Sequence, residues 1–326
     1  MRKDFEQVMA LIFATIAGNV TTAICRLDIP DLLADGSKTS AELAEAAGAD
    51  PGSMYRLARA AAAYGVLTET ETGRFALTDV GQTLRAIPGS LRDLVLAFGD
   101  PGFSRTAAAL DTAVRKGRSP APEVLGSDLW SYFHEHPDEA GHFVGAMGGV
   151  TLATLPGILE AFDTAPYRRI VDIGGSQGEF LTALLGKAPD ATGVLFDQPH
   201  VVDGAPAHDR VERYGGDLFG ELPPGGDLYV LKNVLHDWDD KDAGRILDGT
   251  RRAGLPGHRV TVIEWLIPDG GDDTLPFSID LFLFSVVGGH IRTEREFRDL
   301  FAAHGYELSA NIGVPGGIHL VSATAV

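Results

Sequence analysis

The sequence has 326 residues, which is enough for two domains or for one large one. Its composition, 44% hydrophobic and 22% charged residues, is near the average of folded soluble proteins and argues against a disordered chain. The formal net charge of −18 repels phosphate backbones and anionic lipids, so we expect neither nucleic acid nor membrane as a partner. Cys25 is the single cysteine, which excludes an internal disulfide and a cysteine-rich zinc site. We therefore expect no metal and a cytoplasmic location.

The N-terminal half is predicted to be mostly helical. Its apolar stretch, residues 8–20, is too short to span a membrane and predicts a helix that is buried or forms a dimer interface. Ser40 is a candidate N-cap of a short helix, and residues 51–64 follow with the helical spacing of apolar side chains. Two β-like runs, residues 65–70 and 73–78, then predict a hairpin. Two short helices followed by a hairpin are typical of a winged helix.

Winged helices often bind DNA, which makes a small-molecule-sensing regulator an alternative function. A version that reads DNA usually carries lysine and arginine on its second helix and on its wing. Here the second helix offers Arg56 and Arg59, whereas the wing carries Glu69, Glu71 and only Arg74. Dimerisation or a lid is therefore the favoured role of this half.

From about residue 168, strand-like runs alternate with helical segments, as in a parallel sheet covered on both faces. The predicted strands are residues 168–174, 192–197, 210–217, 227–233 and 259–267. An apolar helix, Leu152–Phe162, leads into this region, and another helix spans Asp240–Arg252. Residues 306–313 and 317–323 are predicted to form an antiparallel hairpin at the sheet edge. We expect an α/β fold that binds its ligand beyond the carboxyl ends of the strands.

The first of these strands runs into a glycine-rich loop, Gly174–Gly178. No register supplies the G-x-G-x-x-G of a dinucleotide fold, and the loop lacks the lysine of a P-loop. The residues Gly174-x-Ser176-x-Gly178 match the G-x-S-x-G elbow of α/β-hydrolases, so a Ser176 hydrolase is an alternative. The context argues against it, because that elbow should follow several strands and an oxyanion-hole loop.

An S-adenosylmethionine site explains more of this neighbourhood. Asp172, at the end of the first strand, would accept a hydrogen bond from the ammonium of the cofactor, and the loop would admit its methionine portion. Asp197 ends the next strand, where an acid would accept from both ribose hydroxyls. After the third strand, Asp217 would lie near the adenine amino group and Phe219 against the ring. Together, in this order and at strand ends, these residues predict a methyl-donor site.

With these motifs the chain resembles the class I S-adenosylmethionine-dependent small-molecule O-methyltransferases of the plant caffeic-acid type and their bacterial natural-product relatives. The matching stretches are VDIGGSQGEF, LFDQPHVV, GGDLF, LKNVLHDWDD, VIEWLIP and GGHIRTEREF, preceded by GADPGSMYRLARAAAAYGVLTET and GRFALTDVGQTLR. The resemblance implies a Rossmann-like methyltransferase sheet with an N-terminal winged-helix dimerisation domain, in a homodimer whose N-terminal segments help to close the partner's active site. It divides the chain into a dimerisation domain (1–100), a helical connector and lid (101–165) and a catalytic domain (166–326).

The same resemblance makes His236, in the HDW motif, the general base that takes the proton of the acceptor hydroxyl. An imidazole beyond a strand end suits that role near neutral pH. Family members flank this base with two glutamates. Glu264 in VIEWLIP supplies the first, whereas Ile291 in GGHIRT stands in place of the second. Support from Glu264 alone, a contribution from His290, an acidic acceptor hydroxyl and an altered, non-methylating chemistry all remain open.

The resemblance also assigns residues to the two ligands. The expected cofactor contacts are Asp172, Gly174, Gly175, Gly178, Asp197, Gln198, Asp217, Leu218, Phe219, Lys232 and Trp238. The expected acceptor contacts are Phe133, Met147, Phe162, Asp237 and Phe284. An apolar, aromatic-lined pocket suits a flat hydroxylated aromatic molecule or a polyketide. We therefore expect O-methylation of such a natural product, with S-adenosylhomocysteine as the second product.

Overall fold

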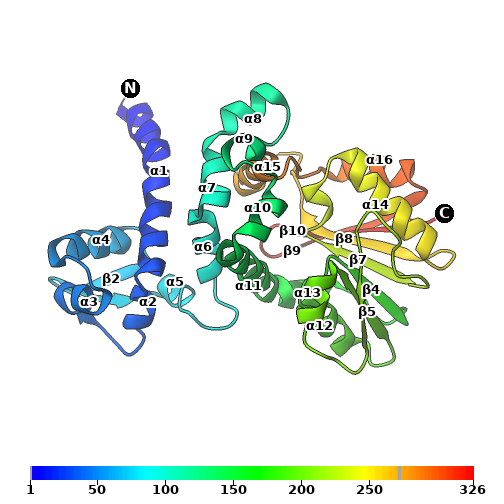
Figure 1. Cartoon of the computed structure of the whole chain (residues 1–326), viewed down its shortest axis with the longest axis horizontal. Coiled ribbons are helices and arrows are strands. Elements are labelled where there is room, and N and C mark those ends of the chain that lie inside the picture. Colours follow the sequence, from blue (N-terminus) through cyan, green and yellow to red (C-terminus); the bar gives the residue numbers. More distant parts are fainter. Residues whose placement is uncertain (1, 271–272) are drawn as a thin grey trace. The chain divides into compact units, whose positions relative to one another are not determined.

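The computed structural model describes residues 2–270 and 273–326. The chain forms two compact units (Figure 1). Unit 1 comprises Met1–Ser104 and Phe133–Val150, and unit 2 comprises Arg105–Tyr132 and Thr151–Val326. The division into three functional segments at residues 100 and 165 stays a prediction.

Unit 1 contains the expected winged helix. Its first elements are α1 (Arg2–Arg26), α2 (Ile29–Leu32), β1 (Lys38–Thr39), α3 (Ser40–Ala47), α4 (Pro51–Ala63), β2 (Leu67–Glu71), β3 (Arg74–Leu77), α5 (Asp79–Gln82) and α6 (Arg92–Gly99). Strands β2 and β3 form the predicted hairpin, and β1 pairs with β3. The N-cap of α3 is Thr39 and not Ser40, because the Thr39 side chain and Glu42 complete a capping box.

Helix α1 is longer than the apolar stretch indicated. It spans 25 residues, so the argument that it is too short for a membrane is wrong. Among the described residues, α1 and α11 (Pro137–Ala161) are long and apolar enough to cross a membrane by length and composition. Much of the apolar surface of α1 is exposed, at Phe5, Val8, Leu11, Ile12, Phe13 and Ile16. The stretch is therefore not buried within its own chain, which leaves an interface with a second molecule as the expectation.

Helices occupy the segment between the winged helix and the sheet. They are α7 (Pro101–Ala108), α8 (Leu110–Lys116), α9 (Ala121–Val124), α10 (Leu129–Glu135) and α11. Helix α11 begins at Pro137 and not at the predicted Leu152. Four glycines between these two positions weaken the helical pattern, which explains the late prediction.

The sheet of unit 2 has seven strands in the order β6-β5-β4-β7-β8-β10-β9. They are β4 (Arg169–Ile173), β5 (Thr192–Asp197), β6 (Val211–Gly215), β7 (Leu228–Lys232), β8 (Arg259–Trp265), β9 (Tyr306–Val314) and β10 (Ile318–Ala325). Strands β4 to β8 are parallel, and β10 runs antiparallel to β8 and β9. The α/β fold and the terminal hairpin at the sheet edge are confirmed.

Different helices cover the two faces of this sheet (Figure 1). Helices α14 (Asp240–Ala253) and α16 (Glu294–Ala303) share a core with Val171 on one face. Helices α12 (Glu179–Lys187) and α13 (Pro199–Gly204), with the end of α11, share a core with Ile170 on the other. Successive strand residues point to opposite faces, so both faces are apolar. The carboxyl ends of the strands are left as the place for a ligand.

Candidate active site

The glycine-rich loop follows β4 and leads into α12. Gly174 and Gly178 have φ angles of 71° and 82°, which glycine adopts at little cost. Gly175 has no room for a side chain, because a Cβ there would lie 2.5 Å from Leu195 Cδ1 and 2.7 Å from Asp172 Oδ2. The loop therefore presents its main chain to the space beyond the strand.

Asp197 connects the end of β5 to this loop. Its Oδ2 accepts a hydrogen bond from Ser176 N at 2.9 Å, and its Oδ1 accepts one from Gln198 N at 2.7 Å. Ser176 has a positive φ of 52° and contributes its main-chain amide to this contact. Asp197 thus fixes the glycine loop, and its contact with a ribose stays a prediction.

A buried and a half-buried charged group come from the neighbouring strands β4 and β7. Asp172 is 1% exposed, its Oδ2 has no hydrogen-bond partner, and burial raises its pKa to about 7 against the opposing charge of Lys232. Burial lowers the pKa of Lys232 to about 8, and its Nζ donates to Thr151 Oγ1 at 2.9 Å. A buried carboxylate oxygen without a partner fits the ammonium of S-adenosylmethionine. The residues present therefore fit this cofactor.

The predicted adenine end is an aromatic cluster. The rings of Phe219 and Trp238 meet edge to face, with centroids 4.7 Å apart. The Arg245 guanidinium lies 4.3 Å from the centroid of Phe219, and Asp217 Oδ1 accepts from Phe219 N at 2.9 Å. Leu218 and both rings pack partly buried against the core. Protein contacts thus fix these rings, and their contact with adenine stays a prediction.

His236 lies in a 3-10 turn, Leu235–Asp237, that follows β7. It is 6% exposed, and its Nδ1 is buried without a hydrogen-bond partner. Burial, and then the charges of Lys232 and Arg292, lower its pKa to about 3, so the imidazole is neutral near pH 7. Its Nε2 lies 3.6 Å from Asp237 Oδ1, which is longer than a hydrogen bond. A neutral imidazole therefore stands at the strand ends that also carry the glycine loop.

Glu264, on β8, contacts the main chain of this turn. It is fully buried, and its Oε1 accepts from the amides of Val234 and His236, both at 3.1 Å. Its Oε2 has no hydrogen-bond partner. Burial raises the pKa of Glu264 to about 7, although the Arg292 charge and the amide hydrogen bonds oppose the rise. Glu264 thus holds the backbone of the turn, and its part in the reaction stays a prediction.

Ile291 occupies a buried position next to this turn. It is 2% exposed, and its amide donates to Asp280 Oδ1 at 2.8 Å. The neighbouring His290 supports the turn through its main chain, since its amide donates to His236 O at 2.9 Å. The His290 ring lies 3.7 Å from Asp240 Oδ1. A main-chain hydrogen bond therefore connects this segment to the proposed base.

The predicted acceptor residues belong to different units. Phe133 and Met147 lie in unit 1, and Phe162, Asp237 and Phe284 lie in unit 2. Phe162 is 6% exposed and belongs to the core on one face of the sheet, which accounts for an aromatic side chain at this position. Phe284, on α15 (Leu275–Val286), is partly exposed. All five acceptor contacts stay predictions.

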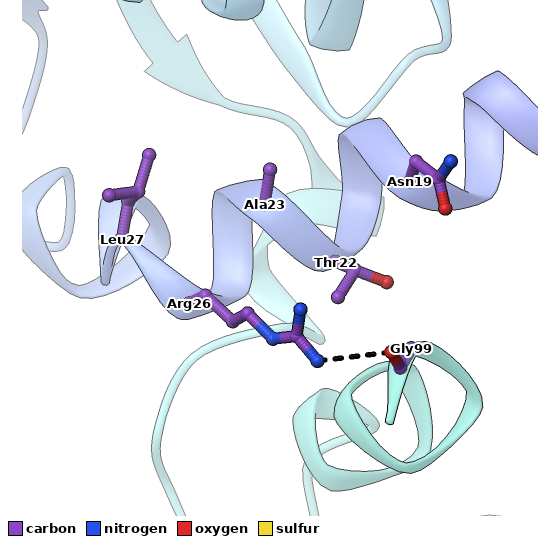
Figure 2. Close-up of a pocket in the computed structure, with 6 residues that line it drawn as sticks. All are labelled: Asn19, Thr22, Ala23, Arg26, Leu27 and Gly99. Atoms are coloured by element: carbon purple, nitrogen blue, oxygen red, sulfur yellow. Dashed lines mark hydrogen bonds between the residues drawn. The ribbon is translucent and has the colours of Figure 1, made fainter. Parts of the chain in front are cut away.

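A pocket of unit 1 contains none of the predicted site residues (Figure 2). It is lined by Asn19, Thr22, Ala23, Arg26, Leu27 and Gly99. The Arg26 side chain donates to Gly99 O at 3.0 Å, and a Cβ at Gly99 would collide with Thr22. These contacts indicate close packing between α1 and α6. Within residues 2–270 and 273–326, no group of three or more His, Cys, Asp or Glu side chains could hold a metal ion.

Two residues of the site were missed by sequence reasoning. Thr151 binds Lys232, and nothing in the sequence around Thr151 indicates this contact. Arg292 is fully buried and donates to the carbonyls of Leu235 and Trp238, on either side of His236. A signal for Arg292 was present, because it directly follows the unexpected Ile291 in GGHIRT.

Family models match most of the chain. The O-methyltransferase domain matches residues 108–307, and the O-methyltransferase dimerisation domain matches residues 9–86. O-demethylpuromycin-O-methyltransferase of Streptomyces alboniger is 36% identical, over 96% of this chain and 86% of the relative. The 8-amino-8-demethylriboflavin N,N-dimethyltransferase of Streptomyces davaonensis is also 36% identical, over 89% of this chain and 86% of the relative.

A solved structure combines both kinds of ligand. The O-methyltransferase NcsB1 from neocarzinostatin biosynthesis, in complex with S-adenosylmethionine and 2-hydroxy-5-methyl naphthoic acid, has a TM-score of 0.78 and 30% identity, covering 95% of this chain and 96% of that one. These matches agree with the two parts of the fold described above, since the two family domains and the similar structure together cover most of the chain. The chain belongs to the O-methyltransferase family and is an S-adenosylmethionine-dependent O-methyltransferase of the natural-product type with an N-terminal dimerisation domain.

Proposed function

We propose that this enzyme methylates a hydroxyl group of a small aromatic or polyketide-type natural product, with His236 as the general base. The observation that carries the base assignment is the neutral, buried imidazole of His236 at the strand ends that bear the glycine loop. The similar NcsB1 structure, which is a complex with a naphthoic acid, supports the acceptor class.

Different residues of the chain would bind the cofactor, accept the proton and support the turn. Asp172 and Asp197 would hold the ammonium and the ribose, and S-adenosylmethionine, when bound, supplies an electrophilic methyl group. His236 accepts the proton of the acceptor hydroxyl, and we assign this proton to Nε2 because Nδ1 is fully buried. Glu264 keeps the turn in place through the amides of Val234 and His236. Much of the rate enhancement comes from the positioning of the two reactants.

A screen of acceptors tests the activity. The enzyme is incubated with methyl-labelled S-adenosylmethionine and hydroxylated aromatic molecules, and the matching methyl ethers serve as controls. We expect label transfer to free hydroxyls only. The replacement His236→Ala should lower turnover about 10²- to 10⁴-fold while the affinity for S-adenosylhomocysteine stays nearly the same. Unchanged turnover would remove His236 from the mechanism.

A second candidate is methylation of an aromatic amine. The similar 8-amino-8-demethylriboflavin N,N-dimethyltransferase favours it, because that enzyme methylates a nitrogen atom. Amino analogues of each acceptor in the same screen separate the two activities. Label on the amine and not on the hydroxyl would replace the O-methyl proposal.

A third candidate is a non-methylating reaction, which Ile291 favours because it stands where a glutamate was expected. Quantifying both products tests it. Equal amounts of methylated acceptor and S-adenosylhomocysteine support methyl transfer. Conversion of the acceptor without a methyl group in the product would support the altered chemistry.

We also propose a homodimer formed through α1. The match to the dimerisation domain and the exposed apolar side chains of α1 support it. Glutamate at Leu11, which is 71% exposed, should shift sedimentation toward the monomer because a charge in an apolar interface is costly. Glutamate at Leu255, 48% exposed and in unit 2, is the matched control and should leave the dimer intact. A dimer that survives Leu11→Glu would rule out this part of α1 as the interface.

A further inference from the structure

Arg292 is a buried cation that the proposed reaction does not yet use. It lies in the loop that joins α15 to α16, and its side chain is fully buried. All three nitrogens of its guanidinium donate to one short segment of the chain. Nε donates to Asp240 Oδ1, Nη1 to Leu235 O and Nη2 to Trp238 O, each at 2.9 Å. Such a planar fork fixes the orientation of what it binds, which a lysine ammonium does not.

The segment that Arg292 binds is the turn that carries His236. The carbonyls of Leu235 and Trp238 lie on either side of His236-Asp237, so the guanidinium holds both ends of the turn. Two neighbours of Arg292 contact the same turn. The amide of His290 donates to His236 O, and a Cβ at Gly289 would collide with that oxygen. Gly289, His290 and Arg292 therefore contact the turn from Leu235 to Trp238.

Arg292 also acts on the turn through its charge. It lowers the pKa of His236, after the larger effects of burial and of Lys232, and so disfavours a protonated imidazole. It also opposes the rise in the pKa of Glu264, so it favours the carboxylate that accepts from the turn. The Asp240 carboxylate, two-thirds exposed, balances the buried cation.

We propose that Arg292 is a positioning residue, which fixes the direction of the His236 imidazole by binding the main chain on both sides of it. This inference rests on the proposed function, in which His236 is the base. In this chain Arg292 would take over the role of the glutamate that Ile291 replaces. It would orient the base through the backbone of His236, whose Nδ1 has no hydrogen-bond partner.

Conservative substitutions test the geometry. Arg292→Lys keeps the charge and loses the fork, so kcat should fall about 10- to 100-fold while the dissociation constant of S-adenosylhomocysteine, measured by calorimetry, changes less than about twofold. Arg298→Lys on α16 is the matched control, because Arg298 is exposed and pairs only with Glu294 among the described ion pairs. It should behave as the wild type. Wild-type kcat in Arg292→Lys would overturn the proposal.

The pH dependence tests the charge. In Arg292→Gln the cation that disfavours a protonated imidazole is gone, so the acidic limb of the pH profile of kcat should move to higher pH. In Arg292→Lys that limb should stay in place. A residue with a merely structural role would lower the amount of active enzyme and leave the limb of both variants unchanged, which would also overturn the proposal.

A double-mutant cycle shows whether Arg292 acts through His236. Adding Arg292→Lys to His236→Ala should lower turnover no further, and a full second loss would overturn the proposal. Wild-type turnover in His236→Ala alone would instead refute the proposed base. If Arg292→Lys does not fold, Asp240→Ala replaces it, since this substitution of an exposed residue removes only the acceptor of Arg292 Nε. Its kcat should fall about three- to tenfold, with no loss in the His236→Ala background.

Discussion

The glycine loop after β4 and the His236 turn after β7 follow adjacent strands, yet different forces hold them. Glycine φ angles and a lack of room for a Cβ at Gly175 determine the loop. Hydrogen bonds to two buried charged residues determine the turn: Glu264 accepts from its amides, and Arg292 donates to its carbonyls. The cofactor side should therefore be sensitive to added volume, and the base side to lost hydrogen bonds and charge.

Among substitutions that leave His236 and Arg292 in place, the largest effect should come from added volume in the loop. In Gly175→Ala the new methyl group would overlap Leu195 and Asp172, so calorimetry should show S-adenosylhomocysteine binding about 10- to 100-fold more weakly. Gly186→Ala on α12 is the control, because a Cβ at Gly186 would meet no atom within 4 Å. Equal affinity in the two variants would contradict a volume-limited loop.

The next effect concerns pH and the buried imidazole. The pKa of His236 is about 3 in the folded chain and near its ordinary value of 6.5 in the unfolded chain. Between pH 3 and pH 6.5 the unfolded chain binds more protons at His236 than the folded chain does. The free energy of unfolding therefore decreases as pH falls below about 6.5. Denaturant unfolding at pH 6.5 and 4.5 should show that the wild type loses about 2 kcal/mol more than His236→Gln. Equal losses would mean that the imidazole is not buried as described.

A smaller effect on kcat distinguishes two roles of Glu264, namely its hydrogen bonds to the main chain and its negative charge. If it mainly supports the main chain, Glu264→Gln keeps an oxygen for the amides of Val234 and His236, and kcat should fall no more than about tenfold. Glu264→Ala leaves both buried amides without an acceptor and should lower kcat and thermal stability further. An equally large fall of kcat in the two variants would indicate that the reaction depends on the charge of Glu264 and not on the hydrogen-bonded oxygen.

The smallest effect is expected at Ser176. Its main-chain amide, and not its hydroxyl, holds Asp197. Ser176→Ala should therefore change kcat and cofactor affinity less than about threefold in the acceptor assay. A complete loss of activity would revive a role for the serine hydroxyl.

Much of the fold could be predicted from the sequence, because its signals are local. The runs from Arg169 and Thr192 are apolar and short, as buried parallel strands are. The positions of Asp172, Asp197 and His236 then follow from where their strands end. The hydrogen bonds of Glu264 and Arg292 could not be predicted in this way. They join residues 28 and 57 positions apart, and a buried arginine is rare enough that sequence patterns place it on the surface.

The chain passes between its two compact units three times, at residues 104, 132 and 150. Unit 1 is completed by residues from the later segment: Phe133 and Phe143 pack against Phe103, and Glu139 accepts from the amide of Gly102. A fragment that ends at residue 104 would lose these partners and expose the apolar side chains that they cover. Chimeras with relatives that are built from a single crossover near residue 100 would mix the two halves of this packing. Exchanging unit 1 intact requires three junctions. The path of the chain between the units, and not only the residues that contact the acceptor, therefore constrains how acceptor preferences can be recombined among such enzymes.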